Sequence, residues 1–403
     1  MNSLKDKSSL GETFNKIWSA AMFSKFADGL FGAAIPLLAA SLTRDPVLIS
    51  IQSNMVLLPW LFFAIPLGAL VDRLNRRTTM ILVQVSRVLI GATIASLVIS
   101  GEMNLWFLMF LTFAFGLSEV VYDTATQSSI PSLLKGHQLE RGNSRLQIAD
   151  TVMQSFIGVP LGAFLFALVV YSPFIGISLC YLVAIFLVFS LRRDALQVEA
   201  KSVARAKLSV EIKEGLIYLY SDKVLFRLVL TTGIDGMFFA LAQSTSVLFI
   251  LDRLKVPEIH YGWVMLPLAV GALIGAFLSP RLSARFGRSK TLSVALVAAS
   301  LPMLISGLWP NLTVYLILGF IQGLFIAQWN ILLMSTYHQM IPNEIFGRIH
   351  GARRTLVWGV MPIGAYLGGL LGTIDLALPL IVGGLGALLV AGSQAKFIAT
   401  IRA

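Results

Sequence analysis

Long apolar stretches, separated by short polar ones, follow one another along the whole chain. Each is long enough for a helix to cross the ~30 Å hydrocarbon core of a bilayer, which takes about 20 residues. They lack the regular alternation of apolar and polar positions that is typical of the strands of a membrane barrel. The pattern therefore predicts twelve membrane-spanning helices. Their approximate ranges are 14–42, 46–71, 78–100, 104–133, 143–170, 173–192, 223–251, 258–282, 289–308, 311–340, 345–372 and 376–397.

The composition supports an integral membrane protein. Hydrophobic residues make up 57% of the 403 residues and charged residues only 13%, whereas about a quarter of a typical soluble domain is charged. The first apolar stretch contains Lys25 and Asp28 and has no small-residue cleavage site. We therefore expect it to remain as the first helix and not to be removed as a signal peptide.

The distribution of positive charge along the chain indicates its membrane topology. The net charge is +11, and Lys and Arg gather at both ends and near 73–77, 135–145, 192–207, 281–290 and 348–354. The alternate loops hold only Arg44, Arg253 and Lys255. By the positive-inside rule, both termini and the long central loop are predicted in the cytoplasm, as in a multi-pass protein of a bacterial cytoplasmic membrane. Nucleic-acid binding is not indicated, because no basic stretch is interleaved with stacking aromatics.

The sequence offers no catalytic or metal-binding pattern. Cys180 is the single cysteine, and the four histidines lack metal-ligand spacing. No glycine-rich phosphate loop is present, and no nucleophile, base and orienting group stand together. We expect no enzyme activity, no metal and no cofactor.

The chain divides into two similar halves. The polar stretch 193–222 separates an N-terminal half, 1–192, from a C-terminal half, 223–403, and its second part has the pattern of an amphipathic linker helix at the inner membrane surface. Four motifs recur between the halves, including "DGLF" at 28–31 and "DGMF" at 235–238. Two repeated six-helix halves are typical of secondary transporters, in which the substrate binds between the repeats.

The sequence "GALVDRLNRR" at 68–77 resembles the loop motif G-x-L-x-D-R-x-x-R-R of the major facilitator superfamily, in the same place between helices two and three. We expect its charged residues to hold the cytoplasmic gate shut through charge-assisted hydrogen bonds. The alternative is that the arginines only set topology. The motif residues are Gly68, Asp72, Arg73, Arg76 and Arg77.

Within that superfamily the chain resembles the macrolide-efflux and enterobactin-exporter branch. The matching segments are "DTATQSSIPSLL", "LERGNSRLQ" and "IPNEIFGRIHGA". In addition, Gly158, Pro160 and Gly162 in "GVPLG" resemble the glycine-proline motif of exporting antiporters, which implies export. These residues make helix five slim and bendable, although close packing without motion explains them equally well.

Charged residues in the apolar stretches are candidates for coupling, because each costs about 2.5–3.5 kcal/mol or more at the bilayer centre. Asp28 and Asp235 occupy equivalent positions in the two halves, where both can face a central cavity. Lys25 precedes Asp28 by three residues and can pair with it on one helix face, either structurally or in proton handling. The other intramembrane cations are Arg87 and Arg227, and Asp150 is a further acid.

Glu119 and Asp123 place two carboxylates one turn apart on helix four. Like charges in a medium of low dielectric cannot both ionise cheaply, so one of them is expected to bind and release a proton. We predict that Glu119, the deeper one, is a coupling acid. For Asp123, nearer the cytoplasm, we favour structural pairing with Arg76.

Amide side chains among aromatics suit a bulky amphipathic ligand, although they can equally well link helix to helix. The candidates for substrate contact are Gln243, Gln322, Gln328, Trp329 and Asn330. The acids favour cationic or zwitterionic substrates.

Together these features predict an exporter, driven by the proton gradient, that works as a monomer by alternating access and takes amphipathic drugs or metabolites. A dedicated exporter of a single metabolite, such as a siderophore, is the alternative. A membrane scaffold without transport activity is less favoured, because it has no need for costly buried charges.

Overall fold

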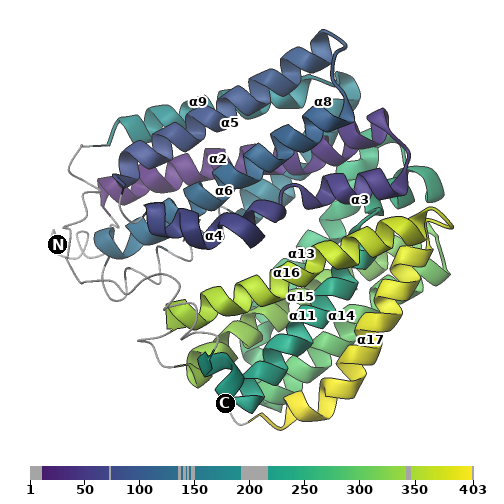
Figure 1. The fold of residues 1–403 in the computed structure, drawn as a ribbon. Coiled ribbons are helices and arrows are strands. Elements are labelled where there is room, and N and C mark those ends of the chain that lie inside the picture. The colour runs from purple at the N-terminus through teal and green to yellow at the C-terminus, as the bar shows by residue number, and fades with distance from the viewer. Residues whose placement is uncertain are drawn as a thin grey trace, which may run out of the picture. The chain divides into compact units, whose positions relative to one another are not determined.

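The computed structural model describes residues 11–71, 74–134, 138, 142, 145–146, 150–191, 217–341 and 346–401. Every regular element within these residues is helical (Figure 1). Among the described residues, eleven stretches are long and apolar enough to span a membrane, and a shorter apolar stretch, Leu356–Gly372, lies in the eleventh predicted helix. The all-α membrane architecture is therefore confirmed for this part of the chain, while the count of twelve helices remains a prediction.

The helices of the first half are α2 (Glu12–Leu42), α3 (Pro46–Asn54), α4 (Leu58–Val71), α5 (Arg76–Ile99), α6 (Leu105–Leu133), η1 (Asp150–Gly158), α8 (Val159–Leu168) and α9 (Ser172–Phe189). Those of the second half are α11 (Lys223–Gln243), α12 (Ser246–Leu248), η2 (Phe249–Arg253), η3 (Glu258–His260), α13 (Tyr261–Phe286), α14 (Arg288–Leu308), α15 (Leu312–Met340), α16 (Phe346–Gly372) and α17 (Leu378–Ala399). Residues 193–216 of the predicted linker lie outside the described ranges.

The chain forms two compact units. The first contains Met1–Leu38 and Phe62–Val203, and the second contains Ala39–Leu61 and Ala204–Ala403. The second unit thus includes α3, which precedes α4 in the chain, and α3 packs on α16. The domain boundaries drawn from the sequence remain a prediction.

The second predicted helix is not continuous. Helix α3 ends at Asn54 and α4 begins at Leu58, with a turn in which the Leu57 N–H donates to the Asn54 carbonyl at 2.9 Å. Pro59 is the second residue of α4, a position where the missing N–H of proline is not needed. The predicted span over 46–71 is thus present as two helices, Pro46–Asn54 and Leu58–Val71, because apolar length alone does not reveal a local break.

The fifth predicted helix contains a π-helix. Residues Asp150–Gly158 form η1, and the chain continues as α8 from Val159. A π-helix is rare and occurs frequently at functional sites. Asp150, its first residue, takes part in the site described below.

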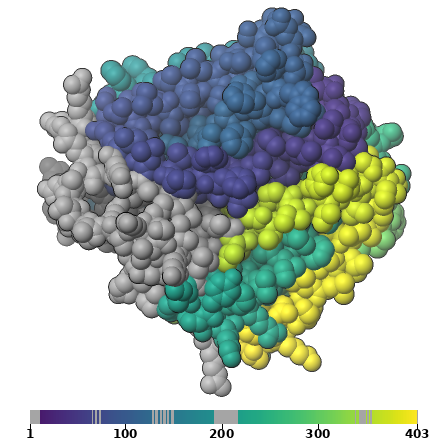
Figure 2. Space-filling model, in the orientation of Figure 1, coloured from purple at the N-terminus to yellow at the C-terminus, as the bar shows by residue number. Residues whose placement is uncertain are grey.

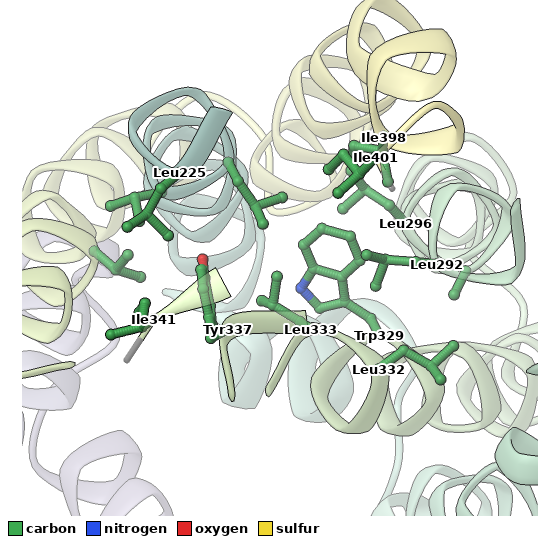
Figure 3. Close-up of a cluster of buried hydrophobic side chains, with 14 of the residues drawn as sticks. Leu225, Leu292, Leu296, Trp329, Leu332, Leu333, Tyr337, Ile341, Ile398 and Ile401 are labelled. Carbon is green, nitrogen blue, oxygen red and sulfur yellow. The ribbon is translucent and has the colours of Figure 1, made fainter. Parts of the chain in front are cut away.

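The core of the second unit contains a large apolar cluster (Figure 3). The indole ring of Trp329 lies among aliphatic side chains of α14, α15 and α17, and only 6% of the residue is exposed. Its neighbours in the cluster include Leu292, Leu296, Leu333 and Ile398. This position gives Trp329 a packing role, and its contact with substrate remains a prediction.

We expect Trp329→Ala to destabilise the protein by about 3 kcal/mol, because the lost ring leaves a cavity in a packed cluster. Trp309→Ala is the matched control, since Trp309 is 66% exposed. Equilibrium unfolding of both variants in mixed micelles measures the difference. Equal stability of the two variants would contradict the packing role.

Candidate functional site

Lys25 is the centre of a charge cluster in the first unit. Its Nζ lies 3.4 Å from Asp28 Oδ2 on the same helix, 3.8 Å from Asp123 Oδ1 on α6 and 3.3 Å from Asp150 Oδ1 on η1. The Lys25–Asp28 pair predicted from the three-residue spacing is present. One ammonium group thus joins three acids from three elements.

Asp28 is held from both sides. Its Oδ1 accepts a hydrogen bond of 2.6 Å from the Tyr181 hydroxyl of α9 and lies 3.4 Å from Arg87 Nη1 of α5, while Oδ2 faces Lys25. Only 4% of its side chain is exposed. A buried carboxylate is tolerable when cations and donors compensate its charge, and here two cations and one hydroxyl do so.

Arg87 is enclosed by aromatic rings. Its side chain is fully buried, and its Cζ lies 5.1, 5.0 and 5.3 Å from the ring centroids of Phe115, Tyr122 and Tyr181. Its Nε donates to Ser118 Oγ at 3.0 Å. A planar guanidinium can stack on rings and donate in its plane at the same time, which an ammonium cannot. The cage keeps the charge of Arg87 beside Asp28.

Hydrogen bonds extend the cluster along α2 and α5. The Gln84 amide donates to Ser24 Oγ, and the Ser24 hydroxyl lies 3.3 Å from the Tyr122 hydroxyl. Sequence analysis missed these residues and Tyr181. The only signal for Gln84 and Ser24 was their position beside Arg87 and Lys25 on the same helices, and no local pattern marked Tyr181.

Acids outnumber bases in this cluster. Glu119 on α6 has no ion-pair partner among the described residues, although it lies in the electrostatic field of the other charged groups. The acids are Asp28, Glu119, Asp123 and Asp150, and the bases are Lys25 and Arg87. Because uncompensated charge in a mostly buried place is costly, the cluster can lower its energy by taking up protons or a cation.

The predicted glycine-proline motif packs against the same turn of α2. A Cβ atom added to Gly158 would lie 2.8 Å from Gly29 Cα, and one added to Gly162 would lie 2.7 Å from the Leu30 carbonyl oxygen. Pro160 lies between them and is buried. The close backbone approach supports the packing explanation of the motif, and bending of the helix remains a prediction.

Asp235 has different surroundings from Asp28. It is half-buried on α11 and has no ion-pair partner in the part of the chain that the structure describes. Its neighbour Gly236 faces the Met361 side chain of α16. Arg227, on the same helix, is exposed, donates to Gln394 at 2.8 Å and stacks 4.1 Å from the Phe397 ring centroid. The two halves therefore repeat the acid without repeating its cage.

The loop motif is described only in part. Asp72 and Arg73 lie outside the described residues, as does the side-chain environment of Gly68. Arg77 donates to the Phe189 carbonyl and stacks 5.1 Å from the Phe189 ring centroid, so it ties the start of α5 to the end of α9. Asp123 forms an ion pair with Lys25, and its predicted pairing with Arg76 remains a prediction. The gate role of the motif remains a prediction.

The amide candidates fall into two groups. Gln322 and Gln328 of α15 are buried, and the Nε2 atom of each has no hydrogen-bond partner among the described residues. Gln243, the last residue of α11, is half-buried, and Asn330 is exposed. Buried amides that lack a partner are the ones with donors to spare for a ligand.

We expect Asp28→Asn to lower the free energy of unfolding by about 3–5 kcal/mol, because it leaves Arg87 buried without its carboxylate. Adding Arg87→Met should recover much of this loss, since neither charge then remains unpaired. A double-mutant cycle in mixed micelles measures the coupling, and strictly additive effects would contradict it. The exposed ion pair of Glu12 and Lys16 supplies the control cycle, Glu12→Gln with Lys16→Met, in which we expect little or no coupling.

A family model described as transmembrane secretion effector matches residues 10–402. The chain is 21% identical to macrolide efflux protein A of Streptococcus pyogenes over 360 residues, covering 89% of this chain and 88% of that protein. It is 25% identical to the multidrug efflux pump Tap of Mycobacterium bovis over 395 residues, covering 92% and 91%.

Solved structures have the same fold. A bacterial homologue of the iron transporter ferroportin, in an inward-facing state, matches with a TM-score of 0.72, 18% identity and coverage of 98% of this chain and 100% of that one. A mutant of the nucleoside transporter NupG matches with a TM-score of 0.73, 14% identity and coverage of 97% and 98%. With the family match over nearly the whole sequence, these findings show that the chain belongs to the transmembrane secretion effector family of the major facilitator superfamily of membrane transporters.

Proposed function

We propose that the protein is a proton-coupled exporter of amphipathic small molecules in a bacterial cytoplasmic membrane. It has twelve membrane helices with both termini in the cytoplasm, and it acts as an antiporter by alternating access. One observation carries the proposal: the charge cluster of the first unit, centred on Lys25 and on the buried Asp28 and Arg87, contains four acids and two bases.

The charge balance supports proton coupling. With all six groups charged, the cluster would have two uncompensated negative charges. Such a net charge is energetically unfavourable where most of the groups are shielded from water. Lys25 contacts Asp28, Asp123 and Asp150 at once. Protonation of one acid therefore leaves the ammonium free to move toward the others, so a proton taken up here changes contacts between α2, α6 and η1.

Glu119 is the proposed proton carrier. Asp28, Asp123 and Asp150 each contact Lys25, whereas Glu119 has no ion pair among the described residues. A carboxyl without a cation of its own gains most from protonation. Asp235 is the corresponding candidate in the second half, for the same reason.

The relatives support export, since two of them are named as macrolide and multidrug efflux proteins. For this chain we propose an amphipathic substrate, held by buried amides such as Gln322 and Gln328. The surplus of acids favours cationic or zwitterionic molecules. The proton gradient supplies the energy without a cofactor, and a single chain suffices because both halves are in one polypeptide.

Inverted membrane vesicles offer a direct test. We expect energised vesicles to take up at least one compound from a panel of dyes, macrolides and a siderophore, and a protonophore should abolish the uptake. Glu119→Gln should lower gradient-driven uptake at least about tenfold, because one proton-binding group is lost. Glu102→Gln is the matched control, since Glu102 is exposed in the loop before α6.

Two results would contradict the proposal. Uptake that persists with the protonophore would exclude coupling to the proton gradient. Uptake by Glu119→Gln equal to that of Glu102→Gln would exclude Glu119 as a carrier.

A further inference from the structure

The π-helix η1 is anchored to α2 by its C-terminal half. A Cβ atom added to Gly158, the last residue of η1, would lie 2.8 Å from the Phe26 carbonyl oxygen and 2.8 Å from Gly29 Cα. The Gln154 carbonyl also lies against Gly29. Gly158 is buried, whereas residues 150–157 are half-buried or exposed. Residues 154–158 are therefore fixed against the backbone of α2, and the residues before them have more room to move.

Asp150, at the other end of η1, is held to the cluster by charge. Its Oδ1 lies 3.3 Å from Lys25 Nζ, and 42% of its side chain is exposed, the largest fraction among the three acids that contact Lys25. The rest of the cluster is more enclosed. Blue atoms of α5 and α6 form a continuous surface on one side of the first unit (Figure 2), and the side chains of Asp28 and Arg87 are 4% and 0% exposed. Asp150 is therefore the acid whose departure changes the packing least.

The hydrogen bonds of η1 and its ion pair favour different helices. A π-helix is rare, because the i→i+4 bonds of an α-helix are normally preferred to its i→i+5 bonds. Conversion of η1 to an α-helix, with 154–158 held in place, would shift the earlier residues by about one position. This shift is about 100° around the axis, because an α-helix has 3.6 residues per turn. Asp150 would turn away from Lys25, and Thr151 would take its place.

The charge of the cluster decides between the two forms. Asp123 Oδ1 and Asp150 Oδ1 share the Lys25 ammonium, at 3.8 and 3.3 Å, so the two carboxylates repel each other. With four acids and two bases ionised, the net charge is minus two. Departure of Asp150 or uptake of one proton would each bring it to minus one. The two events are therefore alternative ways to relieve the same repulsion.

We propose that η1 is a one-residue switch that responds to protonation of the cluster. When the cluster holds a proton, Asp150 stays beside Lys25 and η1 is a π-helix. When the proton leaves, Asp150 turns away, Thr151 replaces it and η1 becomes an α-helix. This inference rests on the proposed proton coupling, because the switch responds to the charge of the same acids.

The direction of the pH dependence follows from the groups around Asp150. Arg145, which precedes η1, is engaged elsewhere, with its Nη1 3.3 Å from Asn15 Oδ1 and its Cζ 5.7 Å from the Trp18 ring centroid. Because acids outnumber bases in the cluster, a rise in pH adds net negative charge and favours the α-helical form. The charged groups of the packed helices are Lys25 and Asp28 of α2, Arg87 of α5, and Glu119 and Asp123 of α6.

A thiol at position 151 tests the switch. Thr151→Cys, in a Cys180→Ser background and in mixed micelles, should lie beside Lys25 only in the α-helical form. A neighbouring ammonium favours the reactive thiolate, so the rate of maleimide labelling at 151, relative to a control thiol, should rise at least about threefold from about pH 6 to about pH 8. The control is Ser155→Cys, in the anchored half of η1. Adding Asp150→Asn should abolish the rise, because residue 150 then has no charge to be repelled.

Equal pH profiles at 151 and 155, or a rise that persists with Asp150→Asn, would exclude the switch. Labelling requires neither substrate nor gradient. A rise at 151 without vesicle uptake would therefore support the switch while the proposed function fails. Proton-driven uptake with equal labelling profiles would support the proposed function and exclude the switch.

A second measurement avoids the thiol probe. Deletion of Val152 should leave a folded protein, because η1 can lose one residue and continue as an α-helix with both ends in place. Deletion of Leu161 from α8 is the matched control, since it displaces the contact of Gly162 with the Leu30 backbone. This control should lose most of the folded protein in size-exclusion chromatography. Equal loss in the two deletions would contradict the conversion of η1.

Discussion

The interaction on which the first unit depends is the compensation of buried charge around Asp28. A carboxylate that is 4% exposed in a membrane helix is stable only with charged partners close by. Those partners come from three places: Lys25 one turn away, Arg87 on α5 and the Tyr181 hydroxyl on α9. Through Lys25 the acids of α6 and η1 join the same network. The electrostatics therefore constrain how four helices and a π-helix pack together.

Backbone contacts and charge depend on each other here. Gly29 lies one residue after Asp28 and meets Gly158, which ends the π-helix that Asp150 begins. A larger residue at either glycine would push η1 away and carry Asp150 from Lys25, at present 3.3 Å away. The glycine-proline motif therefore has a physical reason in this chain. Its small residues let η1 approach α2 closely enough for Asp150 to contact Lys25.

The sequence predicted what depends on local spacing and missed what depends on helix rotation. Apolar length predicted the helices, and the three-residue spacing predicted the Lys25–Asp28 pair. By contrast, Tyr181 is 153 residues from Asp28, and nothing local shows which face of α9 points inward. The same uncertainty explains Trp329, which the sequence grouped with its neighbour Gln328, although its ring packs in the core. The break before Pro59 was also missed, because every residue from 55 to 58 is apolar.

The two halves have an acid at corresponding sequence positions, Asp28 and Asp235, but its surroundings differ between them. Asp28 and Asp235 occupy equivalent positions in their repeats, yet the described neighbours of Asp235 include no cation. Next to it, Gly236 faces a methionine side chain, whereas Gly29 faces the backbone of η1. An acid without a cation and an acid held by two differ in how readily each changes its charge. If duplication had served packing alone, either acid could have been replaced by an apolar residue at lower cost. In the proposed function, the first unit therefore contains an acid compensated by two cations, and the second contains an acid without an ion pair among the described residues.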